Sequence, residues 1–166
     1  LTKEILKALK FQKEKTLIFT LPGSDKFNEV IIKEIKKFVN KNKNAYLFKS
    51  LGGIKFYSCL KVSDAIIGNS SSGILEMPSF QKATINIGDR QKGRLKARSV
   101  IQVDPKMQNI VKAIKKIYTK KFRLTCSRTS NPFHKKSTAK NIVKILSKIN
   151  IKDLKNKKFN DIKNAN

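Results

Sequence analysis

Short apolar runs alternate along this chain with longer segments in which apolar residues recur every three or four positions. The short runs predict strands over residues 15–21, 45–48, 64–68, 83–87 and 99–103. The longer segments predict helices over residues 1–12, 27–40, 54–62, 71–80, 107–118 and 137–149. Because strands and helices alternate, we expect an α/β domain with a Rossmann-like parallel sheet flanked by helices.

Local signals sharpen some boundaries of these elements. Pro22-Gly23 ends the first strand, Pro78 ends or bends the helix over residues 71–80, and Ser137 is placed to cap the last helix. Residues 120–133 have no clear period and are expected to be irregular. We expect residues 1–14 to be a helix continuing from a missing amino-terminal domain, residues 15–150 to form the domain, and residues 151–166 to be a polar, frayed tail.

Two loops follow neighbouring strands at the edge of the sheet where such folds bind ligands. The first contains Gly-Asn-Ser-Ser-Ser-Gly, residues 68–73, after the third strand, and the second contains Arg90, after the fourth. Since both loops leave the carboxyl ends of parallel strands, we expect them to face a common crevice.

The first loop has the composition of an anion site. Small residues and hydroxyls at the start of a helix leave backbone N–H groups open to a phosphate. The candidate phosphate contacts are Ser70 and Ser71, with Asn69, Ser72 and Gly73 as the supporting loop. Glu76 follows as a lone carboxylate that could accept hydrogen bonds from ribose hydroxyls. Taken alone, a serine-rich run is most often a loop or a helix cap, and a glutamate such as Glu76 most often lies on the surface of a helix.

A formal net charge of +27 raises the alternative of a nucleic-acid-binding module. However, 33 of the 38 basic residues are lysines, which spread over every helix, and five are the arginines that base and phosphate recognition favours. Between Val62 and Gln91 the only lysine is Lys82. We therefore interpret the high charge as a general bias of the composition toward lysine, not as a binding surface, and expect no nucleic-acid partner.

Other chemistry-bearing residues are sparse. Cys59 and Cys126 have no metal-type or disulfide-framework spacing, and His134 lies in a polar loop without a partner carboxylate, so we expect no metal and no cofactor. No apolar run reaches the length of a membrane span, and no signal peptide is seen, so we expect a cytoplasmic protein without a membrane partner.

Two blocks together resemble one enzyme family. Residues 67–80, Ile-Gly-Asn-Ser-Ser-Ser-Gly-Ile-Leu-Glu-Met-Pro-Ser-Phe, and residues 84–94, Thr-Ile-Asn-Ile-Gly-Asp-Arg-Gln-Lys-Gly-Arg, resemble the hydrolysing UDP-N-acetylglucosamine 2-epimerases of sialic-acid and related nonulosonic-acid synthesis. Lys49-Ser-Leu-Gly52, Tyr57-Ser-Cys-Leu60 and Asn131-Pro-Phe133 extend the likeness. The resemblance implies the carboxyl-terminal, UDP-binding domain of a two-domain GT-B-type fold.

The resemblance also implies roles. Ser70 and Ser71 would contact the diphosphate, Glu76 the ribose hydroxyls and Arg90 the nucleotide or phosphate region. The family eliminates UDP and releases an N-acetylmannosamine-type sugar, with acid–base groups expected mainly in the missing half, so we expect the fragment alone to be inactive. Where the family usually has Pro-Asn-x-Asp, this chain has Pro22-Gly23-Ser24-Asp25, so we expect no side-chain contact at Gly23; Asp25 could simply cap the next helix.

Several alternatives stay open at this level. A UDP-sugar glycosyltransferase of the same architecture would also bind UDP and would differ in its product. The identity of the UDP-sugar and a homo-oligomeric state are both open.

Overall fold

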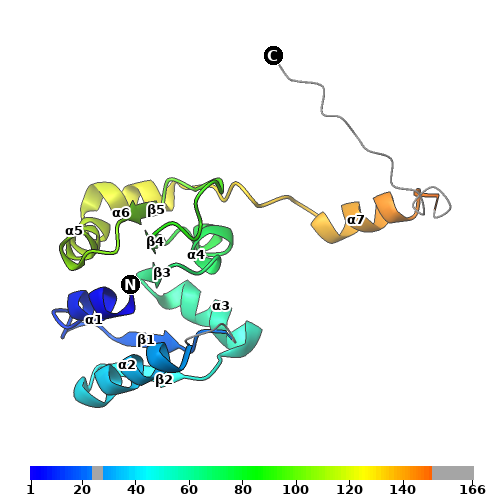
Figure 1. Cartoon of the computed structure of the whole chain (residues 1–166). Coiled ribbons are helices and arrows are strands. Elements are labelled where there is room, and N and C mark those ends of the chain that lie inside the picture. The colour runs from blue at the N-terminus through cyan, green and yellow to red at the C-terminus, as the bar shows by residue number, and fades with distance from the viewer. Residues whose placement is uncertain (24–27, 151–166) are drawn as a thin grey trace. The chain divides into compact units, whose positions relative to one another are not determined.

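The computed structural model of this chain describes residues 1–23 and 28–150 (Figure 1). The chain divides into two compact units, Leu1–Phe133 and His134–Asn166. The expected cap at Asp25 and the expected frayed tail over residues 151–166 lie outside the described residues.

The first unit contains five short strands at the predicted places. They are β1 (Leu17–Thr20), β2 (Ala45–Phe48), β3 (Ala65–Gly68), β4 (Ala83–Ile87) and β5 (Val100–Val103). In the described residues the strands form two sheets, β1–β2 and β3–β4–β5, and all neighbouring strands are parallel. In the second group the register places Asn86 on β4 between Gly68 on β3 and Gln102 on β5. The Rossmann-like parallel arrangement is therefore confirmed.

Helices connect the strands in the order that the alternating pattern predicted. They are α1 (Thr2–Leu9), α2 (Asn28–Lys41), α3 (Gly52–Val62), α4 (Ser72–Leu75), the 3-10 helix η1 (Met77–Phe80), α5 (Met107–Ile117) and α6 (Lys120–Ser127), with α7 (Thr138–Leu146) in the second unit. None of the described helices is long and apolar enough to cross a membrane.

Strand β4 is buried along its whole length and separates two layers of helices. Ile85 and Ile87 join the main core together with residues of α1, α5 and α6, such as Ala8, Ile114 and Phe122. On the other face, Thr84 contacts α4 through a hydrogen bond described below. The alternation of side chains along a strand places Asn86 on the same face as Thr84.

Three local expectations were wrong or only partly right. Residues 120–133 are not irregular, because α6 occupies the first part of them, and its start is capped by Thr119 Oγ1, which accepts from the Phe122 amide at 3.3 Å. The single helix expected over residues 71–80 is two short pieces, α4 and η1, which meet at Glu76. Ser137 precedes α7, but its φ is 57° and its side chain makes no capping hydrogen bond.

A hydrogen bond of Glu4 joins the amino-terminal segment to the rest of the first unit. Glu4 on α1 accepts from the Met107 amide at the start of α5, at 3.0 Å, and pairs with Lys7 at 2.7 Å. These hydrogen bonds lower the pKa of Glu4, with the Lys7 contact as the largest cause. Because Met107 opens α5, the carboxylate satisfies an amide that a helix start leaves unpaired.

In the second unit, α7 is amphipathic, and none of its residues is buried. Its apolar side chains are all exposed: Ile142, Val143, Ile145 and Leu146. His134, which we expected to be structural or exposed, is exposed.

Candidate functional site

The serine loop leaves β3 at its carboxyl end. Gly68 closes the strand with a φ of 150°, a value that favours glycine. The amides of Ile74 and Leu75 both donate to the Ser71 carbonyl at 2.8 Å, so the chain turns into α4 immediately after Ser71. The Ser70 side chain is exposed, and its Oγ accepts from the Ser72 amide at 3.4 Å. The loop therefore presents a hydroxyl and a turn of backbone at the edge of the sheet.

Gly73 allows α4 to lie directly against β4. A Cβ at this position would lie 2.6 Å from Thr84 Cγ2 and 3.3 Å from Ile66 Cγ2, too close for any larger residue without movement. Thr84 Oγ1 also donates to the Gly73 carbonyl at 2.6 Å. Thr84 and Gly73 thus set how closely α4, and with it the serine loop, packs against β4.

Glu76 lies at the junction of α4 and η1, half-buried. One of its carboxylate oxygens, Oε2, is buried and has no hydrogen-bond partner among the described residues. Asn131 hydrogen-bonds to both sides of this junction, because its Nδ2 donates to the Leu75 carbonyl at 2.8 Å and to Ser79 Oγ at 2.6 Å. The backbone around Glu76 is therefore fixed by a residue 56 positions from Leu75 in the sequence.

The second loop leaves β4 through Gly88, whose φ is 74°. The Gly88 carbonyl accepts from Gln102 Nε2 at 2.8 Å, and the Lys92 amide donates to the Asp89 carbonyl at 2.8 Å in a tight turn. Arg90 lies inside that turn and is exposed. Arg90 thus extends its guanidinium group from a loop whose backbone is held by two hydrogen bonds.

Gln91 links the two loops. Its side chain is only 3% exposed, and its Nε2 donates to the Asn69 carbonyl at 2.9 Å. The sequence prediction that the loops share one edge of the sheet agrees with this contact. Within the described ranges, no hydrogen bond or ion pair joins the side chains of Ser70, Glu76 and Arg90 to one another. Their binding roles stay predictions.

Sequence reasoning missed Gln91 and Asn131 as residues that build the site. Both stand in the blocks that carry the family resemblance, and both are amides in otherwise charged or small-residue segments. Their partners lie 22 and 56 positions away, at Asn69 and Leu75. No periodic pattern encodes such contacts.

The titratable groups with shifted pKa values lie outside these two loops. Burial is the main cause that raises the pKa of the Cys126 thiol and, together with the hydrogen bond to Asp64, raises the pKa of Tyr118 to about 12. Among the residues that the structure describes, no group of three or more His, Cys, Asp or Glu side chains is arranged to hold a metal ion. Cys59 is half-buried, and both cysteines are free.

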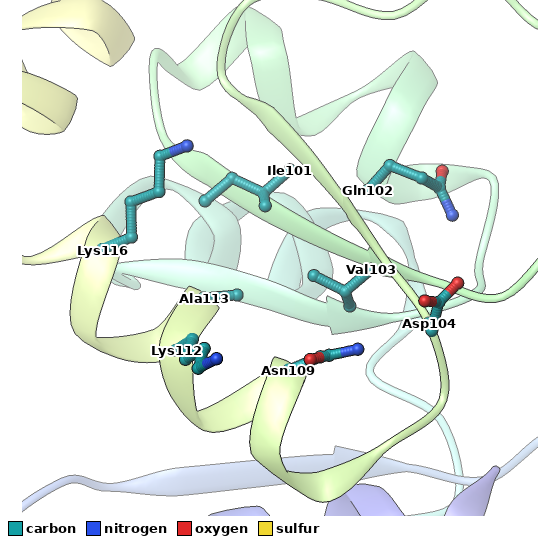
Figure 2. A pocket seen from close by; sticks show the side chains of 8 residues that line it. All are labelled: Ile101, Gln102, Val103, Asp104, Asn109, Lys112, Ala113 and Lys116. Carbon is teal, nitrogen blue, oxygen red and sulfur yellow. The ribbon is translucent and has the colours of Figure 1, made fainter.

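A separate groove of about 320 Å³ lies between β5 and α5 (Figure 2). Its lining residues are Ile101, Gln102, Val103, Asp104, Asn109, Lys112, Ala113 and Lys116. None of the predicted site residues belongs to this set. The groove is thus a different feature from the two loops.

Comparison with known proteins agrees with the family resemblance. A family model described as UDP-N-acetylglucosamine 2-epimerase matches residues 2–147. The chain is 38% identical over 159 residues to polysialic acid biosynthesis protein P7 of Escherichia coli, covering 95% of this chain and 40% of that protein. It is 43% identical over 123 residues to a GDP/UDP-N,N'-diacetylbacillosamine 2-epimerase (hydrolyzing) of Campylobacter jejuni, covering 73% of this chain and 31% of that protein.

The fold is similar to that of solved epimerase structures. The S. aureus MnaA structure with UDP superimposes with a TM-score of 0.73 at 21% identity, covering 88% of this chain and 40% of that chain. The chain thus spans less than half the length of the relatives it matches, with the parallel α/β architecture of a domain of the GT-B-type fold. By its sequence, over most of its length, this chain belongs to the UDP-N-acetylglucosamine 2-epimerase family.

Proposed function

We propose that this chain is the UDP-binding part of a hydrolysing UDP-N-acetylglucosamine 2-epimerase that supplies an N-acetylmannosamine-type sugar for sialic-type acid synthesis. The observation that carries the proposal is the pairing of two loops at the carboxyl edge of β3 and β4. The Gln91–Asn69 hydrogen bond joins the serine loop to the loop that presents Arg90. Hydroxyls, backbone amides and a guanidinium at one edge suit a diphosphate.

Glu76 provides the second part of the proposed site. An unpaired carboxylate oxygen away from water is unfavourable, since it loses hydration without gaining a donor. If the Glu76 side chain rotated slightly toward a bound ribose, Oε2 would gain the ribose hydroxyls as hydrogen-bond donors. Glu76 would then select a ribonucleotide, while Ser70, Ser71 and Arg90 would hold its phosphates.

In the proposed reaction, a proton leaves the carbon next to the anomeric carbon, and the electron pair of that C–H bond forms the double bond of a glycal. At the same time, the bond between the anomeric carbon and the diphosphate oxygen breaks, and its electron pair stays on UDP. Water then adds across the double bond, its oxygen to the anomeric carbon and a proton to the neighbouring carbon. The groups of this chain would stabilise the charge growing on UDP, because they are already oriented before the reaction begins. The groups that remove and return the sugar's proton would belong to parts of the relatives that this chain does not match. We therefore expect the chain by itself to bind UDP and to release no N-acetylmannosamine-type sugar. We also expect it to act in the cytoplasm, where its free cysteines stay reduced.

Calorimetric titration with UDP tests the proposed function. Glu76→Gln keeps the size of the side chain and removes its charge, so we expect about tenfold weaker UDP binding, as for the loss of a hydrogen bond to a charged group. Glu29→Gln on α2 is the matched control and should leave the affinity unchanged, since Glu29 is exposed on another helix.

Arg90 is tested by comparing ligands with and without phosphates. Arg90→Lys keeps the charge and loses the forked geometry, so it should weaken UDP more than uridine. No UDP binding by the unmodified chain at millimolar concentration would refute the proposed function. Sugar release from UDP-N-acetylglucosamine by this chain alone would refute the assignment of the acid–base groups to another part.

A further inference from the structure

The Gln91 side chain is buried to an unusual degree for a glutamine in a loop between two strands. It is 3% exposed, although Arg90 and Lys92 on either side of it are exposed. Glutamine is seldom buried unless its amide has a specific partner. Here the partner of Nε2 is the Asn69 carbonyl, the residue directly before Ser70.

The identity of the bonding atom fixes the orientation of this amide. A carbonyl such as that of Asn69 can only accept, so the side-chain nitrogen of Gln91 must face it and Oε1 must point elsewhere. Oε1 is buried and has no hydrogen-bond partner among the described residues. The orientation of the amide is therefore set by the bond to Asn69 and not by a protein partner of its oxygen in the described part of the chain.

The loop that contains Gln91 is held at a second point. Gln102 Nε2 donates to the Gly88 carbonyl, and Gln102 Oε1 accepts from Asn86 Nδ2 at 2.7 Å and from Lys96 Nζ at 2.8 Å. Arg90 lies between the two anchored residues, Gly88 and Gln91. Because the chain is held on both sides of Arg90, the backbone of Arg90 has little freedom to move.

We propose that Gln91 is a positioning residue, which fixes the position of the serine loop relative to Arg90 so that both can contact the same anion. This inference rests on the proposed function and adds to it the residue that couples the two loops. Ser70 and Arg90 lie in loops that follow different strands. Because both loops are already ordered before the ligand arrives, less conformational entropy is lost on binding. Gln91 itself touches no ligand in this account.

Hydrogen exchange of the 166-residue chain tests the coupling without any ligand. Gln91→Met keeps the length and apolar stem of the side chain and removes the N–H donor. We expect about tenfold faster exchange of the backbone amides in residues 69–75, although the substitution lies in the other loop. Asn44→Leu is the matched control, because Asn44 Nδ2 also joins distant backbone, at Gln12 O and Lys15 O, in the β1–β2 region.

Ligand binding separates a positioning role from a merely structural one. Gln91→Met should weaken UDP about tenfold and uridine little, whereas general destabilisation would weaken both alike or neither. Gln91→Leu, which also lacks the N–H donor and adds no charge, provides a second variant should Gln91→Met fail to fold, and it should behave in the same way.

Unchanged exchange in residues 69–75 overturns the inference, and so does faster exchange with unchanged UDP affinity. If the unmodified chain binds no UDP, the proposed function fails, while the exchange measurement still decides whether Gln91 couples the two loops.

Discussion

The two edges of the β3–β4–β5 sheet carry different kinds of contact. At the carboxyl edge, the neutral amides of Gln91, Gln102 and Asn131 donate to backbone carbonyls. At the amino edge, a cluster surrounds Tyr118, whose hydroxyl donates to Asp64 Oδ2 at 3.1 Å. The Tyr118 ring also has Lys15 Nζ 4.5 Å and Arg123 Cζ 5.3 Å from its centroid.

This difference separates precise positioning from simple attachment. The buried Gln91 amide holds the Asn69 carbonyl at a defined distance and angle, and water competes poorly for this bond, whereas Asn131 is half-buried and Gln102 is exposed. Contacts of cations with an exposed aromatic face tolerate a range of geometries and are each worth about 0.5–1 kcal/mol. The edge proposed to bind UDP therefore has a backbone contact, from Gln91 to Asn69, that is shielded from water. The following predictions test this contrast, from the largest expected effect to the smallest.

The largest effect should come from Gly73→Ala at the carboxyl edge. The added Cβ would lie 2.6 Å from Thr84 Cγ2, so α4 must move away from β4. We expect the free energy of unfolding in urea to fall by about 1–3 kcal/mol, as for other overpacked sites, with weaker UDP binding. Adding Thr84→Ser removes the clashing methyl and keeps the hydroxyl, so the double variant should recover most of the loss. No recovery would contradict the steric explanation.

Asn131→Leu should have the next largest effect, because it leaves the half-buried Leu75 carbonyl without its donor. We expect a loss of about 1–2 kcal/mol in the free energy of unfolding and UDP binding weakened severalfold through Glu76. Asn42→Leu removes another amide-to-carbonyl bond, to Phe38 on α2, and is the control for stability alone. Equal UDP affinities in the two variants would argue against a role of Asn131 at the site.

Tyr118→Phe at the amino edge should cost less than about 1 kcal/mol, since the ring and its cation contacts remain and Asp64 can be hydrated again. The pKa of Tyr118 is raised to about 12, so its hydroxyl stays protonated in the folded chain at a pH where an unfolded tyrosine ionises. Its contribution to stability therefore falls as the pH rises from about 10 toward 12. Absorbance titration near 295 nm should show a late ionisation that Tyr118→Phe abolishes. UDP affinity should not change.

The smallest effect should come from Glu4, which is on α1 and accepts from the Met107 amide. Its folded-state pKa is lowered from 4.5, so its contribution is complete above that pH and is lost as the pH falls below it. Urea unfolding at pH 7 and at pH 3 should show that Glu4→Gln loses less stability on acidification than the unmodified chain does. Glu29→Gln provides the baseline for an exposed carboxylate. A larger acid sensitivity in Glu4→Gln would contradict this sign.

The accuracy of the sequence prediction varied from element to element, for physical reasons. The five strands were found because short apolar runs between helical segments have few other structures available. The helix α6 was missed because its lysines and arginine hide the buried pair Phe122 and Cys126, four positions apart. The helix over residues 71–80 was predicted as one piece, whereas the chain breaks it at Glu76, just before Pro78.

The loops of the site were predicted by their motifs, and the contacts between them were not. The amino-acid types at Ser70, Glu76 and Arg90 suggested phosphate and ribose chemistry, and the order of the strands placed the two loops at one edge. The bonds of Gln91 to Asn69 and of Asn131 to Leu75 depend on how α4 lies on β4 and where the chain returns after α6.

The sequence by itself determined the parallel α/β architecture and the family to which the chain belongs, and it predicted the edge of the sheet at which a ligand would bind. Those properties follow from local periodicity and from short motifs, which are continuous in the chain. Only the tertiary structure decided that Gln91 faces the Asn69 carbonyl, that Gly73 has no room for a Cβ, and that Glu76 keeps one oxygen unpaired. The physical reason is that packing distances and hydrogen-bond partners are set between segments far apart in the sequence, where local patterns carry no information.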